Sequence, residues 1–379
     1  MGGPGVNPFD AVAPGALRLR RSAKWAAHGA DVLPMWVAEM DVALAEPVRE
    51  ALADAVGRSD TGYAHPGRLG EAFAAFAADR WDWSDVEPRR TMLVPDVMRG
   101  IAEALRVLTP DGAAVVLDTP AYPPFFHWIT DIGRRYVPVP DFDLGRLERA
   151  FADGAAAYLL CNPHNPTGTV RTRAELEAIA ELADRYDVQV VVDEIHAPLV
   201  YDGAVHVPFA SLDAPAARRA VVLVSASKAW NLAGLKAALL VAGPGSWPVV
   251  SAIPDEVRYG SGLLGVIATE AAWLAGTPWL DEVLTVLDGR RRLLADLLAE
   301  QTPAVGYAVP AATYLAWLDF RGTGLGDDPA VELLRRGGVA LSSGPTFGTA
   351  GRGYARLNFG TSEAVLRDGV ARIASALRA

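Results

Sequence analysis

Residues 188–196 have the sequence Val-Gln-Val-Val-Val-Asp-Glu-Ile-His. The run of β-branched residues predicts a strand buried on both faces, and Asp193 follows at its carboxyl end. Similar apolar runs at 157–160 and 221–224 also lead into polar residues. Residues 172–186 predict a helix, because the segment opens with a Thr-x-x-Glu capping box. Alternating strands and helices predict an α/β fold with a mostly parallel sheet that helices cover on both faces.

The pattern changes after a long helix that is expected at 278–301. Short strands, glycine-rich turns and a terminal helix follow, which indicates a smaller α+β domain. We therefore expect a large domain over 42–275 and a small domain built from 1–41 and 276–379, with the N-terminal segment packed against the latter. The arginines at 290–292 are expected to face solvent.

The composition is that of a globular protein. Apolar residues make up 51% of the 379 residues and charged residues 21%, and the formal net charge is −10. No long basic block or extended apolar run is present, so neither nucleic acid nor a membrane is the expected partner. The start, MGGPGVNPFD, lacks the pattern of a secretory leader, and Cys161 is the single cysteine. We expect a cytoplasmic protein with no disulfide and no structural metal.

Polar residues follow three of the predicted strands at their carboxyl ends, where open parallel sheets bind ligands. Asn165, Asp193 and Lys228 would deliver an amide, a carboxylate and an amine into one crevice. Taken alone, Asp193 could cap a helix and Lys228 could be a surface lysine. Together they favour a cofactor held by a lysine as a Schiff base, with an acid paired to its ring nitrogen.

Five motifs occur in the order that one known family shows, at 35–41, 161–168, 193–196, 225–228 and 356–360. The chain resembles the fold-type I enzymes that depend on pyridoxal 5'-phosphate (PLP), which share the aspartate aminotransferase fold. Within them it resembles the branch of cystathionine β-lyases and related C–S lyases typified by MalY and PatB. The resemblance covers nearly the whole chain, and five ordered motifs are far more specific than any one of them.

The resemblance implies roles around the cofactor ring. Lys228 would carry PLP and then move the proton at the substrate Cα, while Asp193 would keep the ring nitrogen protonated. Asn165 would hydrogen-bond the phenolic oxygen of the cofactor. Tyr122 would stack on the ring, although it could also be a core aromatic beside a proline turn. His196 lies where the lyase branch has histidine, and it could also orient Asp193.

The phosphate of PLP requires donors and positive charge. A helix is expected to begin at Val97, so that the amides of Val97, Met98 and Arg99 would point at an anion. Relatives usually have glycine where this chain has Asp96. A carboxylate next to a phosphate is unfavourable, so Asp96 must point away or the alignment is shifted by one residue. The remaining implied phosphate ligands are Ser225, Ser227 and Lys236, the last of which could also be an exposed helix lysine.

Further residues are implied for the substrate and for assembly. Arg356 would bind the α-carboxylate with its planar guanidinium, and Trp36 and Ala38 would line the substrate side. Tyr63 matches a tyrosine that reaches the phosphate of a neighbouring subunit, which implies a homodimer with shared active sites. It could also be an ordinary surface or interface aromatic.

Three activities are compatible with this fold. A β-lyase is favoured, because many transaminases carry a tyrosine where this chain has His196. An aminotransferase is the alternative, and Pro198 departs from the lyase branch, which often has an acidic residue nearby. A regulatory protein with an aminotransferase-like domain is disfavoured, because such proteins add a basic helix-turn-helix module and the residues before the first motif show no paired helices.

Overall fold

The computed structural model describes residues 7–378 and divides them into two compact units. Unit 2 comprises Ala45–His164 and Val170–Thr277, and unit 1 comprises the described residues up to Leu44, Asn165–Thr169 and the residues from Pro278 onward. The short segment Asn165–Thr169 was expected in the 42–275 domain but groups with unit 1. The reason is local: the carbonyl of Gly168 accepts hydrogen bonds from the amides of Ala311 and Ala312.

Unit 2 is built on one sheet, whose strand order is β2-β8-β7-β6-β5-β3-β4 in the described residues. The sheet is mostly parallel, as predicted, and β8 is antiparallel to both of its neighbours. The strands are β2 Thr91–Val94, β3 Ala114–Thr119, β4 Arg135–Pro140, β5 Ala157–Cys161, β6 Gln189–Asp193, β7 Val221–Val224 and β8 Ala238–Ala242.

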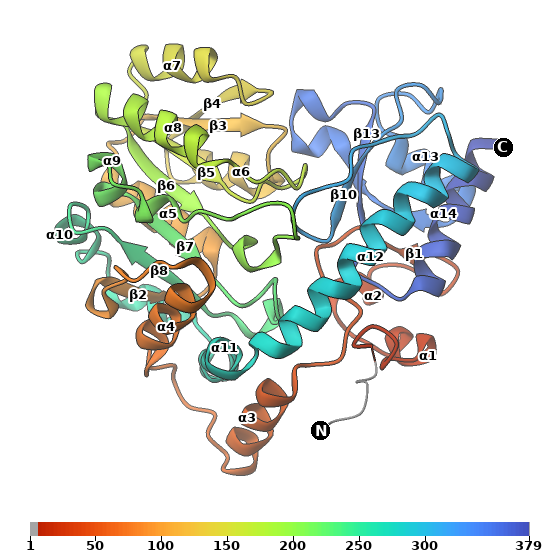
Figure 1. Ribbon diagram of the computed structural model, residues 1–379, viewed down its shortest axis with the longest axis horizontal. Helices are drawn as coiled ribbons and strands as arrows, with labels where there is room; N and C mark the ends of the chain where they lie inside the picture. Colours follow the sequence, from red (N-terminus) through yellow and green to blue (C-terminus); the bar gives the residue numbers. More distant parts are fainter. Residues whose placement is uncertain (1–6, 379) are drawn as a thin grey trace. The chain divides into compact units, whose positions relative to one another are not determined.

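Helices cover both faces of this sheet (Figure 1). On one face the core includes side chains of α5 Val97–Leu108, α6 Pro123–Asp131 and α10 Trp247–Val250. On the other face Phe151 of α7 packs edge-on against Tyr158 at 5.8 Å between ring centres. The predicted capping box is confirmed at the start of α8. The remaining helices of the unit are α3 Glu46–Gly57, α4 Leu69–Trp81, α7 Leu144–Ala152, α8 Arg173–Arg185, α9 Pro215–Arg219, α11 Leu263–Ala275 and the short 3-10 helices η1 Pro88–Arg90, η2 Ala197–Leu199, η3 Phe209–Ser211, η4 Ala233–Leu235 and η5 Asp255–Gly260.

Unit 1 combines an antiparallel sheet of order β12-β13-β10-β9 with the long helix α12, drawn in cyan in Figure 1. The N-terminal segment joins this unit as expected, because β1 pairs in parallel with β11. The elements are α1 Pro14–Arg18, α2 Ala23–Ala26, β1 Leu33–Pro34, α12 Thr277–Gln301, β9 Gly306–Tyr307, β10 Leu315–Asp319, α13 Pro329–Gly337, β11 Val339–Ala340, β12 Ser342–Ser343, η6 Gly344–Phe347, η7 Thr349–Gly351, β13 Tyr354–Asn358 and α14 Glu363–Arg378.

The expectation that the arginines at 290–292 face solvent was wrong for two of them. Arg290 and Arg291 are buried, and Arg292 alone of the three is exposed. Arg290 donates to Glu363 at 2.9 Å, and Arg291 donates to the carbonyl of Pro310 at 2.8 Å. The charge of Arg290 is compensated by Glu363, far along the chain, whereas that of Arg291 is compensated by Asp288, three residues earlier on the same helix.

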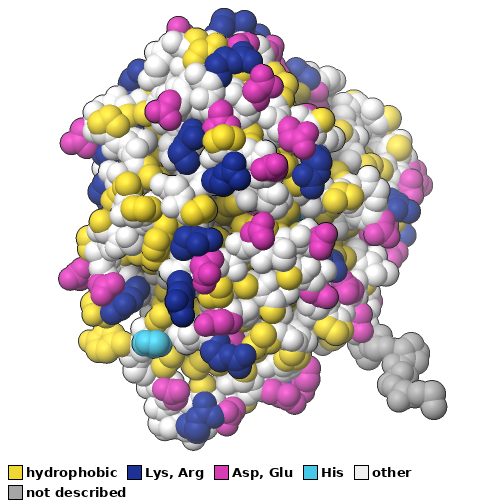
Figure 2. Space-filling view, turned by 60° about the vertical axis from the view of Figure 1, so that its left-hand side comes forward, with side chains coloured by type: hydrophobic (Ala, Val, Ile, Leu, Met, Phe, Trp, Pro, Cys, Tyr) yellow, Lys and Arg dark blue, Asp and Glu magenta, His cyan; other side chains and the backbone are white. Residues whose placement is uncertain are grey.

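The surface carries charges of both signs. Figure 2 shows, on the face that it displays, Lys and Arg side chains interspersed with Asp and Glu rather than gathered into one basic field. Within residues 7–378 no single helix is long and apolar enough to span a bilayer; α11 and α12 pass such a test only as a pair, which is bent by 81°. Those residues also contain no cluster of three or more His, Cys, Asp or Glu side chains suited to a metal ion.

Candidate active site

The three strands predicted to deliver site residues are neighbours in the sheet of unit 2, in the order β7-β6-β5. Their registers align Cys161 of β5 with Asp193 of β6, and Asp193 with Leu223 of β7. Because parallel strands end at the same edge of the sheet, the segments that follow β5, β6 and β7 meet there. This edge of unit 2 is the candidate cofactor site.

Asp193 ends β6 as a buried acid. It is 4% exposed, and one carboxyl oxygen accepts a hydrogen bond from the amide of Ile195 at 3.0 Å. Burial raises the pKa of Asp193 to about 7, and the charge of Glu194 adds to the rise, while the Ile195 amide and the charge of Lys228 oppose it. A further cation next to the carboxylate, such as a protonated ring nitrogen, would hold Asp193 ionised. The site therefore fits a pyridine cofactor.

This buried acid predicts a distinctive pH dependence of stability in the cofactor-free protein. The folded chain has a pKa of about 7 at Asp193, whereas the unfolded chain has about 3.9. Between about pH 4 and pH 7 the Asp193 carboxyl is therefore protonated in the folded chain and ionised in the unfolded chain. The free energy of unfolding falls as the pH rises through this range. Asp193→Asn has no such proton, so it should raise the free energy of unfolding at about pH 8 and raise it much less at about pH 5. Urea unfolding at both pH values measures this, and an equal gain at the two would contradict the raised pKa.

Lys228 lies in the turn that follows β7, with Ser225 and Ser227. Its side chain is half-buried, and its positive charge acts to lower the pKa of Asp193. The hydroxyl of Ser225 donates to the carbonyl of Ala237 at 2.7 Å and accepts from the amide of Ser227 at 3.1 Å. These bonds fix the turn in shape. The hydroxyl proton of Ser225 is already donated to the Ala237 carbonyl, so Ser225 could donate to a phosphate only by giving up that bond.

The expected phosphate site at the start of α5 differs in detail from the prediction. Asp96 caps the helix, and its carboxylate accepts from the amide of Arg99 at 2.8 Å. The amide of Arg99 therefore already has an acceptor in Asp96. The amides of Val97 and Met98 are the first two of the helix. The other oxygen of Asp96 lies 2.9 Å from Nζ of Lys236, so this lysine already neutralises a carboxylate.

The remaining predicted residues of unit 2 are a mixture of buried and exposed groups. Tyr122 precedes α6 and packs edge-on against Phe125 at 5.5 Å between ring centres. His196 is buried and precedes η2. Tyr63 is 87% exposed, and its ring meets that of Tyr259 at 6.2 Å.

Unit 1 carries the predicted substrate residues around Arg356 of β13. The guanidinium is buried and donates to Oδ1 of Asn165 at 2.9 Å, to the carbonyl of Trp36 at 3.1 Å and to the hydroxyl of Ser342 at 3.2 Å. It also lies over the ring of Phe347 at 5.0 Å. These contacts hold the guanidinium plane in one orientation, as recognition of a planar carboxylate requires. The sequence assigned Asn165 to the cofactor and Arg356 to the substrate, without a contact between them. In the structure the two side chains are hydrogen-bonded to each other.

Two contacts of Arg356 escaped the sequence reasoning. Ser342 belongs to a strand of two residues, and Phe347 to a short 3-10 helix. Neither segment has a periodicity that would single these residues out. Ala38 and Trp36 lie in a segment without regular structure, where the carbonyl of Ala38 accepts from the hydroxyl of Tyr314 at 3.0 Å. The buried indole N–H of Trp36 has no acceptor among the described residues.

Comparison with known proteins agrees with this geometry. Residues 31–373 match the family model for aminotransferase class I and II. A protein of Mycobacterium leprae named "putative cystathionine beta-lyase" is 45% identical, with 98% of each chain covered. Cystathionine beta-lyase PatB of Bacillus subtilis is 35% identical, covering 94% of this chain and 97% of PatB. The crystal structure of a "putative plp-dependent beta-cystathionase" from Corynebacterium diphtheriae superposes with a TM-score of 0.93 at 37% identity, covering 97% and 98% of the chains.

Relatives named as aminotransferases are more distant. The aspartate aminotransferase of Pyrococcus abyssi is 25% identical, with 98% of this chain and 96% of that protein covered. The chain therefore belongs to the class I and II aminotransferase family of PLP-dependent enzymes, in its cystathionine β-lyase branch, which includes PatB and MalY.

Proposed function

We propose that this chain is a PLP-dependent C–S β-lyase, which cleaves cystathionine or another S-substituted L-cysteine to a thiol, pyruvate and ammonia. The observation that carries the proposal is the full-length identity to proteins named cystathionine β-lyase, which exceeds that to proteins named aminotransferases. The buried His196 supports it, because many transaminases have tyrosine at this position. An aminotransferase of the same fold is the alternative.

The residues at the carboxyl edge of the unit 2 sheet suit PLP. Bound there, PLP supplies a ring that accepts the electron pair left when the substrate Cα loses its proton. Asp193 would hold a proton at the ring nitrogen, and Tyr122 would cover one ring face. The amides of Val97 and Met98, with Ser225, Ser227 and Lys236, would bind the phosphate. Asn165 would donate to the phenolic oxygen.

Lys228 has two tasks in this proposal. Its amine would hold the cofactor, and when released it would act as the base that removes the proton from the substrate Cα. Lys228 is half-buried, and the charge of its amine interacts with the carboxylate of Asp193. Arg356 would fix the α-carboxylate, so that the Cα proton is presented in one orientation.

The leaving group then decides between elimination and transamination. A thiolate leaves readily from Cβ, since the conjugate acid of a cysteine-like thiol has a pKa of about 8.5. The Cβ–S bond breaks, the sulfur takes the electron pair and a proton, and the three-carbon remainder reacts with one water to give pyruvate and ammonia. No keto-acid acceptor enters this balance, whereas a transaminase requires one for every turnover.

A substrate panel tests the proposal and also identifies the sulfur substituent. L-Cystathionine, L-cystine and S-alkyl cysteines share the α-amino acid half that Lys228 and Arg356 would recognise, and they differ beyond the sulfur atom. Keto acid and free thiol are assayed separately for each compound. Release of keto acid without thiol across the whole panel would reject the lyase.

We also propose a cytoplasmic homodimer in which each active site borrows Tyr63 from its partner. A tyrosine that is 87% exposed is unusual for a large aromatic side chain, and its exposure supports a role in assembly. The half-exposed Tyr259, against which it packs, extends the same aromatic surface. A single buried cysteine is compatible with a reducing compartment.

Shared sites predict complementation between inactive chains. Co-expression of Lys228→Ala chains with Tyr63→Phe chains should restore activity, because one of the two sites in the heterodimer has both an intact Lys228 and an intact Tyr63. A mixture in which one chain carries both substitutions and the other carries Lys228→Ala should stay inactive. Activity is measured on heterodimers purified through two different affinity tags, and absence of any rescue would place complete sites within single chains.

A further inference from the structure

The segment 35–41 of unit 1, called here the strap, has no regular structure, and yet every carbonyl from Met35 to Met40 accepts a hydrogen bond. Buried backbone groups outside helices and sheets require such partners. Most of them are side chains that reach the strap from far along the chain. The donors are Asn358 N and Nδ2, Arg356 Nη2, Ser342 Oγ, Tyr314 Oη, Lys24 Nζ, Arg20 Nη1 and the amide of Glu39.

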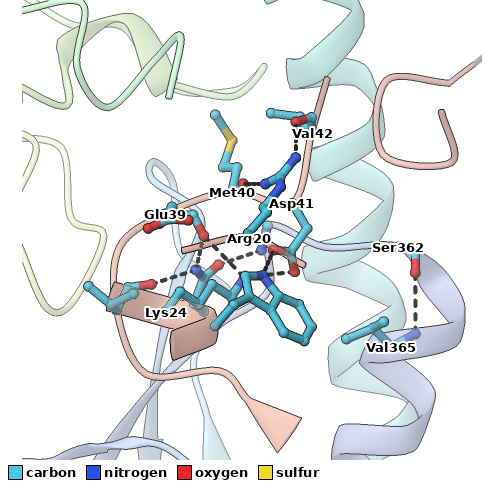
Figure 3. A network of polar contacts seen from close by, with 12 residues as sticks. Arg20, Lys24, Glu39, Met40, Asp41, Val42, Ser362 and Val365 are labelled. Carbon is cyan, nitrogen blue, oxygen red and sulfur yellow. Dashed lines mark hydrogen bonds and ion pairs between the residues drawn. The ribbon is translucent and has the colours of Figure 1, made fainter. Parts of the chain in front are cut away.

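A buried ion pair fixes the carboxyl-terminal end of the strap. Lys24 and Asp41 each have side chains that are 1% exposed, and Nζ lies 2.7 Å from Oδ2. The indole N–H of Trp25 donates to the other carboxylate oxygen at 2.8 Å, and Lys24 donates also to the carbonyl of Glu39 at 3.1 Å. Figure 3 shows Lys24 next to Glu39 and Asp41 of the strap, with Arg20 reaching the carbonyls that flank Asp41.

Stability alone does not account for this pair. The desolvation penalty of two buried charges can equal or exceed their mutual attraction, and apolar replacements of buried pairs are often neutral or stabilising. The contacts of Lys24 and Asp41 instead fix geometry, since they join α2 to both ends of one peptide stretch, Glu39–Asp41. The backbone amide of Asp41 is held as well, by the carbonyl of Gly360 at 2.9 Å.

The strap in turn contacts the substrate residue Arg356. The carbonyl of Trp36, at its other end, accepts from the Arg356 guanidinium at 3.1 Å. Asn358, two residues further along β13, donates from one amide nitrogen to the carbonyls of Val37 and Glu39, and Lys24 donates to that same Glu39 carbonyl. Hydrogen bonds and the strap backbone between Trp36 and Glu39 thus connect Lys24 to the guanidinium.

We propose that Lys24 and Asp41 are positioning residues for the substrate α-carboxylate, which act by locking the strap that orients Arg356. This inference rests on the proposed function only in so far as Arg356 binds an amino acid. A bidentate contact between guanidinium and carboxylate depends steeply on orientation. Loss of the lock should therefore weaken recognition of the carboxylate and leave the attachment of PLP to Lys228 unchanged.

The test compares two small probes that differ by one carboxylate. L-Alanine and ethylamine are titrated into PLP-loaded protein, and the change in visible absorbance gives an affinity for each. Lys24→Met should weaken L-alanine binding about tenfold or more while ethylamine binding stays as in the wild type. Trp25→Phe removes one donor to Asp41 and keeps an aromatic ring, so it should weaken L-alanine binding to a smaller extent. This variant replaces Lys24→Met in the test if Lys24→Met fails to fold.

Arg290→Met is the matched control, because it removes another buried cation of unit 1, whose partner is the half-exposed Glu363 and not the strap. It should leave the ratio of L-alanine to ethylamine affinity unchanged. In cofactor-free protein, hydrogen exchange of the Met35 and Asp41 amides should accelerate in Lys24→Met and not in Arg290→Met. The inference is overturned if the ratio of L-alanine to ethylamine affinity in the Lys24 or Trp25 variant that folds stays within about twofold of the wild-type ratio. It is also overturned if the wild type binds the two probes equally well. Neither result depends on whether thiol is released, so the lyase proposal stands or falls separately.

Discussion

Lys228→Ala should abolish turnover of any S-substituted cysteine, with a loss of at least about 10³-fold, because it removes both the attachment point of the cofactor and the base that takes the Cα proton. The variant should still bind PLP, since Asp193 and the helix N-terminus at Val97 remain. Its visible spectrum should be that of PLP held without a covalent link. Borohydride reduction of the wild type followed by peptide mapping should place the label on Lys228.

Two other lysines serve as controls for this assignment. Lys236 pairs with Asp96 and Lys24 with Asp41, so neither amine is placed to carry the cofactor. Lys236→Ala should keep the covalent link and lose affinity for PLP. A label recovered on Lys236 or Lys24 in place of Lys228 would refute the site as a whole.

Asp193→Asn should lower kcat by at least about a hundredfold, which corresponds to ~2.7 kcal/mol of barrier, with a smaller effect on PLP affinity. The amide keeps the shape of the side chain but cannot hold a proton at the ring nitrogen, so the ring accepts electrons poorly when the Cα proton leaves. Steady-state kinetics and the equilibrium affinity for PLP, measured on the same preparation, separate the two effects.

Asp118→Asn is a matched control for that variant. Asp118 lies near the end of β3 in the same sheet and is buried, with its pKa raised to about 6 by burial. Its carboxylate accepts from the hydroxyl of Tyr158 at 2.6 Å. The proposed mechanism gives it no role, so kcat should change by less than about tenfold. If Asp193→Asn also stays within that range, another residue protonates the ring nitrogen.

The sheet and its helices could be predicted because their signals are local. The apolar run before Asp193 has the length and the β-branched composition of a buried strand, and α8 begins at the capping box that the sequence displays. The meeting of the segments after β5, β6 and β7 in one place could be expected because successive βα units tend to lie side by side. The polar residues after those strands were identified for the same reason.

Features that depend on distant partners could not be predicted. The burial of Arg290 rests on Glu363 of another helix, and the orientation of Arg356 rests on Ser342 and on the carbonyl of Trp36. Asp96 shows a different limit. Aspartate is a favoured helix cap, so the local signal for its position was present, but comparison with a glycine in relatives made it seem a mismatch.

The most direct test of the central claim is the stoichiometry of the reaction with L-cystathionine in the absence of any keto acid. The account predicts sustained turnover that releases free thiol and pyruvate in equal amounts, with ammonia as the third product. Turnover that requires 2-oxoglutarate and liberates no thiol would contradict the lyase and assign the site to an aminotransferase.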